Sequence, residues 1–177
     1  MADLVGHGIT VPLPSGWEGR IGIRQPVLSG AVTGPALRTL AGAAAGADGA
    51  DDGSGNRYPV THLANFALPA DRGDFGSGAV DIMGTTDCLV ALIEYGPENV
   101  DTALFARRPS LPQPGATDFD PNTLQHKIRS QLGYQRFCTV GGRAFCVYVV
   151  IGGSRNLVPL AGSARSVLGG IRIGAAR

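Results

Sequence analysis

Apolar and polar residues alternate along several short segments of this chain, and such alternation predicts β-strands. The clearest case is the segment WEGRIGIR at residues 17–24, whose apolar row is Trp17, Gly19, Ile21 and Ile23. A period of two directs one face of a strand to the core and the other face to solvent. We therefore expect a half-buried strand that begins at Trp17.

Residues 8–13, just before this strand, have the composition of another short strand. Pro14, Ser15 and Gly16 between them favour a tight turn, because proline presets φ and glycine tolerates positive φ. The pattern therefore predicts a hairpin. We expect structural roles for Pro14, Gly16 and Trp17, with the indole packed on the sheet or on a flanking helix. The alternative is a ligand site built on an exposed tryptophan, and the apolar row favours the structural interpretation.

The middle of the chain predicts two further strands. Residues 58–69 alternate, whereas residues 87–95 (DCLVALIEY) are apolar on both faces, which is typical of a central strand. Residues 75–84 predict a turn or one to two helical turns. Residues 97–105 predict a short helix with Pro97 in its first turn.

The most regular unit is RFCTV-GG-RAFCVYVVI at residues 136–151. It predicts a hairpin of two long strands joined at Gly141 and Gly142. Before it, Asp120 is a suitable N-cap and Pro121 a suitable first residue for a helix over NTLQHKIRSQL.

A last helix and a short last strand follow this hairpin. Ser154 or Asn156 can cap the helix, and residues 171–173 have the pattern of a strand. The apolar residues at helical spacing, which we expect to pack on the sheet, are Leu160, Ala161, Ala164, Val167 and Leu168.

Two segments lack the apolar residues that a buried element needs. Residues 25–57 are of low complexity and predict a long exposed loop insertion, and residues 106–121 form a proline-rich connector. The whole pattern predicts an α+β fold: one domain over residues 1–177, with an antiparallel sheet flanked by helices (an α/β sandwich) and long Gly/Ala/Pro-rich loops.

Composition adds an expected location. The first residues lack a basic region followed by an apolar run, and no stretch approaches the ~20 apolar residues of a membrane span. We therefore expect a soluble cytoplasmic protein without a signal peptide or membrane contact. Three cysteines are too few for a disulfide scaffold.

Charge is unevenly distributed along the chain. Residues 48–120 hold twelve acidic residues and four arginines, a net charge of −8, and residues 121–177 hold eight basic residues and no acid. The two parts can neutralise each other within one fold. They can also give the protein an acidic and a basic face, which favours contacts with partners or copies. The candidate contact residues are Arg107, Arg108, Lys127, Arg129 and Arg136.

The residue patterns that would indicate catalysis or metal binding are missing. His7, His62 and His126 lie far apart, and none has a second ligand at metal spacing, so we expect no metal and no cofactor. His62 lies in the apolar row of a predicted strand, which favours a core or edge histidine over a metal ligand. The acid-rich run at residues 48–52 lacks the alternation and the closing glutamate of a calcium loop. No serine lies in a G-x-S-x-G motif. The basic residues are too widely spaced to favour a nucleic-acid partner.

Two cysteines lie in the long hairpin, and their relation depends on its register. A two-residue turn places Cys138 opposite Phe145, whereas a three-residue turn places it opposite Cys146. The sequence leaves both the register and a Cys138–Cys146 bond open. The aromatic and aliphatic neighbours favour buried thiols over a nucleophile.

The junction GGSRN before the last helix offers a different possibility. Backbone N–H groups of a glycine-rich turn at a helix start can hold an anion, and an arginine can assist. An alternative hypothesis is therefore a small-ligand or anion-binding module, or an enzyme with a dispersed site. Its candidate residues are Gly152, Gly153, Ser154 and Arg155. The simpler interpretation is a capped helix start after a strand.

The PSGW turn at residues 14–17, with the order of elements that follows it, resembles the Mog1/PsbP-type α/β sandwich. In that group a Pro-x-Gly-Trp turn near the start is frequent. Its chains often end in a helix and a short strand, here residues 158–168 and 171–173. The resemblance implies an antiparallel sheet with flanking helices and a non-catalytic adaptor or assembly factor, with no catalytic residue to carry over.

A second resemblance concerns LQHKIRSQLGYQRFCTVGGRAFCVYVV at residues 124–150. This segment is similar to small uncharacterised actinobacterial proteins associated with contractile phage-tail-like injection particles. It implies a subunit of such a particle. We therefore expect a non-enzymatic structural or accessory subunit that acts through contacts with a protein partner, or with copies of itself, in a larger assembly.

Overall fold

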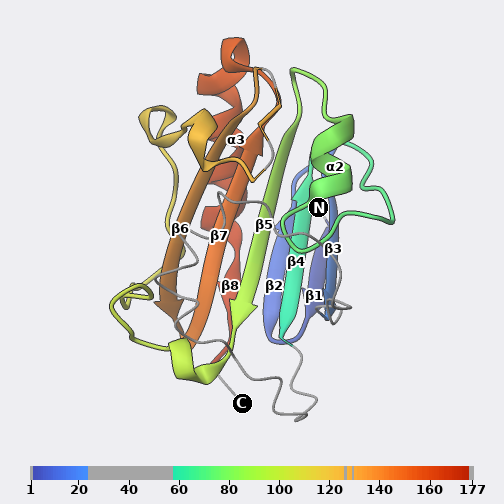
Figure 1. Ribbon diagram of the computed structural model, residues 1–177. Coiled ribbons are helices and arrows are strands. Elements are labelled where there is room, and N and C mark those ends of the chain that lie inside the picture. Colours follow the sequence, from blue (N-terminus) through green and yellow to red (C-terminus); the bar gives the residue numbers. More distant parts are fainter. Residues whose placement is uncertain (1, 24–57, 126, 129, 176–177) are drawn as a thin grey trace.

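The computed structural model describes residues 2–23, 58–125, 127–128 and 130–175. The strands of this part form two antiparallel sheets, one of three strands and one of five (Figure 1). The predicted α+β class is therefore confirmed. The predicted loop at residues 25–57 lies outside the described residues. The strand that follows this segment begins at Pro59.

The small sheet has the order β1-β2-β8, and the large sheet has the order β3-β4-β5-β7-β6. The strands are β1 Ala2–Gly6, β2 Ile9–Leu13, β3 Glu18–Ile23, β4 Pro59–Ala64, β5 Cys88–Tyr95, β6 Leu132–Val140, β7 Arg143–Ile151 and β8 Arg172–Ile173. The described α-helices are α2 Ser77–Ile82 and α3 Leu157–Gly170, and the 3₁₀ turns are η1 Pro97–Asn99, η2 Ala116–Asp118, η3 Pro121–Thr123 and η4 Ser154–Asn156.

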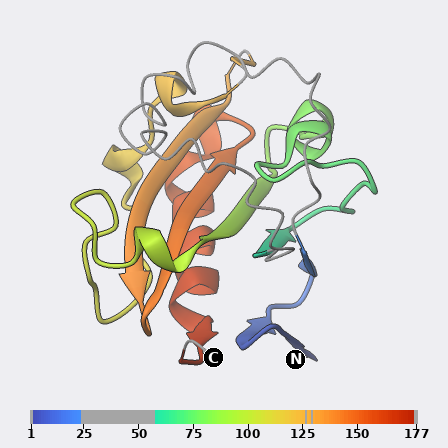
Figure 2. The same cartoon turned by 60° about the horizontal axis from the view of Figure 1, so that its bottom comes forward.

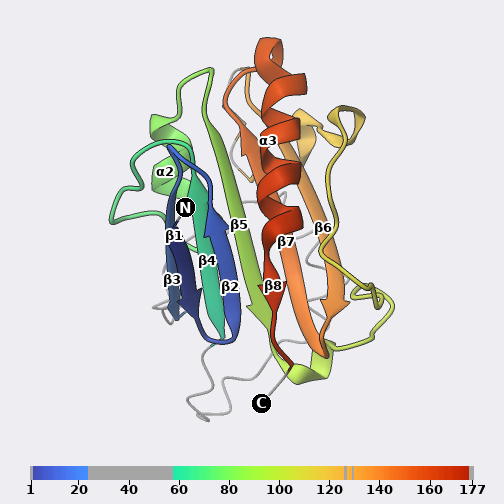
Figure 3. The ribbon, with the colours of Figure 1, turned by 180° about the vertical axis from the view of Figure 1, so that it is seen from behind.

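The two faces of the large sheet are covered by different elements. Helix α3 and the small sheet lie on one face, as Figures 2 and 3 show, and α2 lies on the other. Each face therefore has its own apolar core. Strands β5 and β7 form the centre, and every residue of β7 is buried. The prediction of a central strand at residues 87–95 is confirmed.

The predicted hairpin of residues 8–13 and 17–24 is wrong in its pairing. Strand β2 pairs with β1 and β8, whereas β3 pairs with β4. The Pro14–Trp17 segment is a turn, with Trp17 N–H donating to Pro14 O at 3.1 Å and Gly16 at φ 78°. It passes the chain from the small sheet to the large one. Periodicity identified the strands, but it carries no information about which edge each strand meets.

Trp17 lies just before β3 and packs, partly buried, against the core between the sheets. The alternation after it is confirmed, because the odd-numbered residues of β3 are the more buried ones. Gly19 is required here: a Cβ atom at this position would lie 2.7 Å from Cδ2 of Leu4. The structural role expected for Trp17 agrees with this placement.

The long hairpin is confirmed as β6 and β7. Gly141 and Gly142 form its two-residue turn with φ of 61° and 75°. This register places Cys138 opposite Phe145, and the three cysteines are buried thiols that form no disulfide bond.

The last helix is confirmed as α3, with the five predicted apolar residues buried. The helix expected after Asp120 shortens to η3, where Asp120 Oδ1 accepts from Asn122 N at 2.7 Å. Leu124 is already extended, and Asp120 and Gly133 pair through their backbones on the outer edge of β6. The helix expected at residues 97–105 likewise shortens to η1.

Candidate functional site

At the predicted anion site before α3, two backbone N–H groups and one side-chain amide donate to carbonyl groups of the chain itself. Gly152 N–H donates to Asp87 O at 2.9 Å, and Ser154 N–H donates to Ser130 O at 3.1 Å. The Asn156 side chain donates to Thr85 O at 2.9 Å instead of capping the helix. This geometry does not favour the anion site, which stays an untested prediction.

The glycines of this junction have a packing role. A Cβ atom on Gly152 would lie 1.9 Å from Gly84 O, and one on Gly153 would lie 2.7 Å from Thr85 O. The loop between α2 and β5 therefore lies directly on this junction. Ser154 and Arg155 are exposed beside it.

The proline-rich connector, residues 106–121, lies along the outer edge of β6. Thr139 N–H donates to Ala106 O at 3.1 Å, and Arg108 N–H donates to Thr139 O at 2.8 Å. At the other end of the strand, Asp120 and Gly133 exchange two hydrogen bonds of 2.9 and 3.1 Å. The connector thus pairs with both ends of an edge strand and protects these two ends of the edge.

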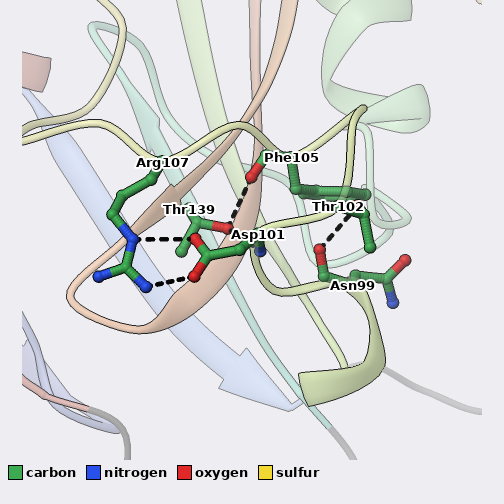
Figure 4. Close-up of polar contacts among 6 residues, drawn as sticks. All are labelled: Asn99, Asp101, Thr102, Phe105, Arg107 and Thr139. Atoms are coloured by element: carbon green, nitrogen blue, oxygen red, sulfur yellow. Dashed lines mark hydrogen bonds and ion pairs between the residues drawn. The ribbon is translucent and has the colours of Figure 1, made fainter.

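The fully buried Thr139 side chain forms hydrogen bonds with the segment that leads into the connector (Figure 4). Its hydroxyl donates to Phe105 O at 2.8 Å and accepts from Asp101 N–H at 2.9 Å. The Asp101 carboxylate receives the Arg107 guanidinium through Nε and Nη2. The pair is exposed, so it contributes little to stability.

Between its two covered ends, β6 has an open stretch at Gln135–Phe137. In this hairpin the odd-numbered residues of β6 direct their backbone groups away from β7. Gln135 and Phe137 make no backbone hydrogen bond to the described connector. On this open edge, Arg136 Nη1 donates to Gln135 O at 2.9 Å.

The structure brings three of the predicted contact residues to this edge, and we call Arg107, Arg108 and Arg136 the β6 rim. Arg136 stands 5.3 Å from the centre of the Tyr134 ring, and the charges of Arg108 and Arg136 both act on Tyr134. Neither Arg108 nor Arg136 forms an ion pair with a described residue. Asp118 and Asp120 of the connector border the rim.

The remaining contact candidates stand apart from the rim. Lys127 is exposed, and its Nζ donates to Asn122 Oδ1 at 2.8 Å. Arg129 lies outside the described residues.

The buried thiols have the properties of core residues. Burial raises the pKa of Cys88 to about 12 and that of Cys138 to about 11, so both are protonated thiols at neutral pH. Since the thiolate is the nucleophile, this setting is the reverse of an activated cysteine. The described residues contain no group of three or more His, Cys, Asp or Glu side chains placed to hold a metal.

His62 is likewise a core histidine. It is 5 % exposed on β4, and its Nε2 lies 2.9 Å from Asp74 O. Burial lowers the pKa of His62 from 6.5 to about 4, and the Arg72 charge acts in the same direction. The imidazole is therefore neutral at physiological pH, as the sequence led us to expect of a core histidine.

A second feature, missed by the sequence analysis, lies where the two sheets meet at the ends of β5 and β7. Glu94 and Arg143 form an ion pair whose side chains are 10 % and 7 % exposed. Arg143 Nε donates to Glu94 Oε1 at 2.9 Å, and Nη2 donates to Glu94 Oε2 and to His7 O, the latter at 3.0 Å. Both residues line a pocket of about 330 Å³, which we call the layer-end pocket.

The sequence contained a signal for this pair. Glu94 is the one charged residue inside the otherwise apolar CLVALIEY, and Arg143 begins a fully apolar strand. Two isolated opposite charges in buried strands indicate mutual pairing, because an unpaired buried charge is costly.

Comparisons with known proteins add no relative. No family model, no curated protein and no solved structure matches this chain. The two resemblances noted in the sequence therefore stay predictions. In the described part of the chain, none of the helices has the length and apolar content to cross a membrane.

Proposed function

We propose that this chain is a non-enzymatic structural or accessory subunit that binds another protein through the β6 rim. The observation that carries the proposal is the position of Arg108 and Arg136, two exposed guanidinium groups that form no ion pair with a described residue, beside the open stretch of an edge strand. Exposed arginines with planar donor groups are well suited to carboxylates of a partner.

The chemistry of this edge defines the kind of partner. An extended segment can pair with the outward backbone groups of Gln135 and Phe137, as peptides do at sheet edges, once the Arg136 side chain leaves Gln135 O. The open stretch is short, because the connector covers both ends of β6. Most of the affinity must then come from side chains, and the two arginines favour an acidic segment.

The setting of the side chains supports a binding role over a catalytic one. The Cys88 and Cys138 thiols are protonated, and the His62 imidazole is held by a backbone carbonyl. The finer hypothesis, a subunit of a contractile phage-tail-like injection particle, rests only on the likeness of residues 124–150. It identifies the partner to look for first.

The test is affinity purification from the cells that make the protein, with quantitative identification of bound proteins. The rim variant carries Arg108→Glu and Arg136→Glu. Its matched control carries Arg20→Glu and Arg155→Glu, which reverse two exposed charges at other places. Thermal unfolding confirms that each variant folds.

We expect the wild type and the control to retain the same partner and the rim variant to lose it. Binding should also weaken as salt is raised, since exposed charges are screened. Sedimentation at low and high salt tells a second copy of this chain from a different protein. The proposal is rejected if the rim variant retains every partner of the wild type, or if the wild type enriches no protein and sediments as a monomer.

A further inference from the structure

The elements that line the layer-end pocket meet at the lower end of the two layers in Figure 1. Its walls come from the β1–β2 turn, the start of β4, the end of β5 and the start of β7. Its volume of about 330 Å³ lies at the lower end of the range of small-molecule sites, ~300–1,000 Å³. The pocket is therefore large enough for one small ring.

One hydrogen-bond donor of the pocket remains unused. Arg143 Nε and Nη2 are engaged by Glu94 and by His7 O, but no described residue accepts from Nη1. Nη1 lies beside Gly8, where an added Cβ atom would approach it to 3.1 Å. The absence of a side chain at Gly8 keeps space open next to this nitrogen.

The charge of Arg143 is already balanced. Glu94 accepts two hydrogen bonds from the same guanidinium, and both side chains are at least nine-tenths buried. An anion at Nη1 would be repelled by the nearby Glu94 carboxylate, and a cation would be repelled by Arg143. Next to a buried ion pair a third charge is costly, so the pocket favours an uncharged acceptor.

Apolar and aromatic residues form part of the other walls, next to His7. Pro59 and Val100 line the pocket, and the aromatic residue Tyr58 stands at the start of β4. Such surfaces favour contact with an apolar ring, while a single polar group sets its orientation. The pocket thus combines ring-sized apolar walls with one directed donor.

We propose that the layer-end pocket binds a small uncharged ring that carries an amide or ketone oxygen, with this oxygen accepting a hydrogen bond from Arg143 Nη1. The site is independent of protein binding at the β6 rim. It also differs in place and in ligand charge from the anion site expected at the start of α3.

The test uses pyrrolidone, the uncharged five-membered lactam, as the probe. Its charged analogues are pyrrolidinium and cyclopentanecarboxylate, which have rings of the same size. Backbone amide shifts of the full chain are followed by NMR during titration to millimolar concentrations of each. We expect pyrrolidone to cause saturable shifts at Gly8, Val100 and Gly142, which line the pocket, and we expect no saturable shift there from either charged analogue.

Variants assign these shifts to the pocket. Val100→Trp fills the space and should abolish them, whereas Val158→Trp, at a residue 71 % exposed on α3, should leave them unchanged. Ala175→Trp, at a second lining residue, replaces the first variant if that one does not fold. Arg143→Lys keeps a positive charge opposite Glu94 but lacks the guanidinium donor, so it should fold and lose the shifts.

Three results would overturn the proposal. The first is the absence of any saturable shift at the lining residues with pyrrolidone. The second is equal binding of a charged analogue, which would contradict the charge balance. The third is undiminished pyrrolidone binding by the folded Arg143→Lys protein. The rim variant, with Arg108 and Arg136 reversed, should bind pyrrolidone like the wild type, which separates the two proposals.

Discussion

Arg143 joins both sheets by binding Glu94 of the neighbouring strand and the carbonyl of His7 in the small sheet, partners that lie 49 and 136 residues away in the chain. His7 adopts φ 49° and Gly8 adopts φ 73° in the turn that presents this carbonyl. Gly8 O also accepts from Gly174 N–H at 2.8 Å, which holds the chain beyond β8. One buried arginine therefore connects the first strands, the centre of the large sheet and, through the turn, the C-terminal segment.

Removal of one partner of this pair should be strongly destabilising. Glu94→Gln leaves the Arg143 charge buried without its counter-charge, and we expect a loss of ~3–5 kcal/mol in the free energy of unfolding. Urea denaturation followed by circular dichroism measures it. The control is Glu98→Gln, at an exposed residue of η1. Equal midpoints for Glu94→Gln and wild type would show that the pair has no role in holding the sheets together.

Stability should fall in acid because of His62. Its folded pKa, about 4, lies below the unfolded value of 6.5, so between these values the unfolded chain binds a proton that the folded protein does not. Stability is therefore lost as pH falls through this window, by at most about 3 kcal/mol. Denaturation at several pH values should show a smaller loss for His62→Gln. A parallel loss in both proteins would assign the effect to other groups.

Thr139→Val should loosen the connection between β5 and β6. It removes the hydroxyl that pairs with Asp101 N–H and Phe105 O, and each buried group left unpaired costs ~1–3 kcal/mol. Hydrogen exchange at the Asp101 amide should become faster, together with a lower urea midpoint. Thr139→Ser keeps the hydroxyl and should retain slow exchange. Unchanged exchange in the valine variant would show that the segment is held by other contacts.

Gly152→Ala separates the packing role of the α3 junction from a ligand role. The new Cβ atom would lie 1.9 Å from Gly84 O, so we expect a loss at or above the upper end of the ~1–3 kcal/mol typical of overpacking. Arg155→Ala, at an exposed residue, should stay within about 0.5 kcal/mol of wild type. Thermal unfolding with and without phosphate tests both, and a phosphate shift that depends on Arg155 would restore the anion hypothesis.

Trp17→Ala should destabilise the protein at or below the low end of the ~3–5 kcal/mol typical of large aromatic core residues, because the side chain is only partly buried. Gly16→Ala meets no neighbouring atom but must adopt φ 78°, so we expect a smaller loss of ~1–2 kcal/mol. The urea midpoints of the two variants show which substitution causes the larger loss of stability. A Trp17→Ala protein as stable as wild type that had lost its partner would identify the indole as a binding residue.

Local features of the fold could be predicted from the sequence. Alternation located β3, the run of apolar residues identified β5 as central, and the Gly141–Gly142 pair located the turn between β6 and β7. The 3.6-residue spacing identified the buried face of α3. Each depends on neighbours within a few residues, where backbone geometry and burial leave a direct pattern in the sequence.

Residues 120–132 show where local reasoning fails. Asp120 and Pro121 form a suitable helix start, and they do begin a 3₁₀ turn. The helix does not continue as expected, and Asp120 also pairs with Gly133 at the edge of β6. The Asp120 carbonyl accepts from Thr123 N–H within the turn and from Gly133 N–H of the strand, both at 3.1 Å, and a local pattern carries no signal for the second contact.

The sequence by itself therefore determined the α+β class, most of the strands and the burial of the cysteines and His62. Only the tertiary structure decided that β2 and β3 belong to different sheets, that three arginines meet at the β6 rim, and that Glu94 faces Arg143. The physical reason is separation along the chain. Strand pairing and ion pairing depend on the summed packing of distant segments, and a local pattern of apolar and polar residues specifies the face of a strand but not its neighbour.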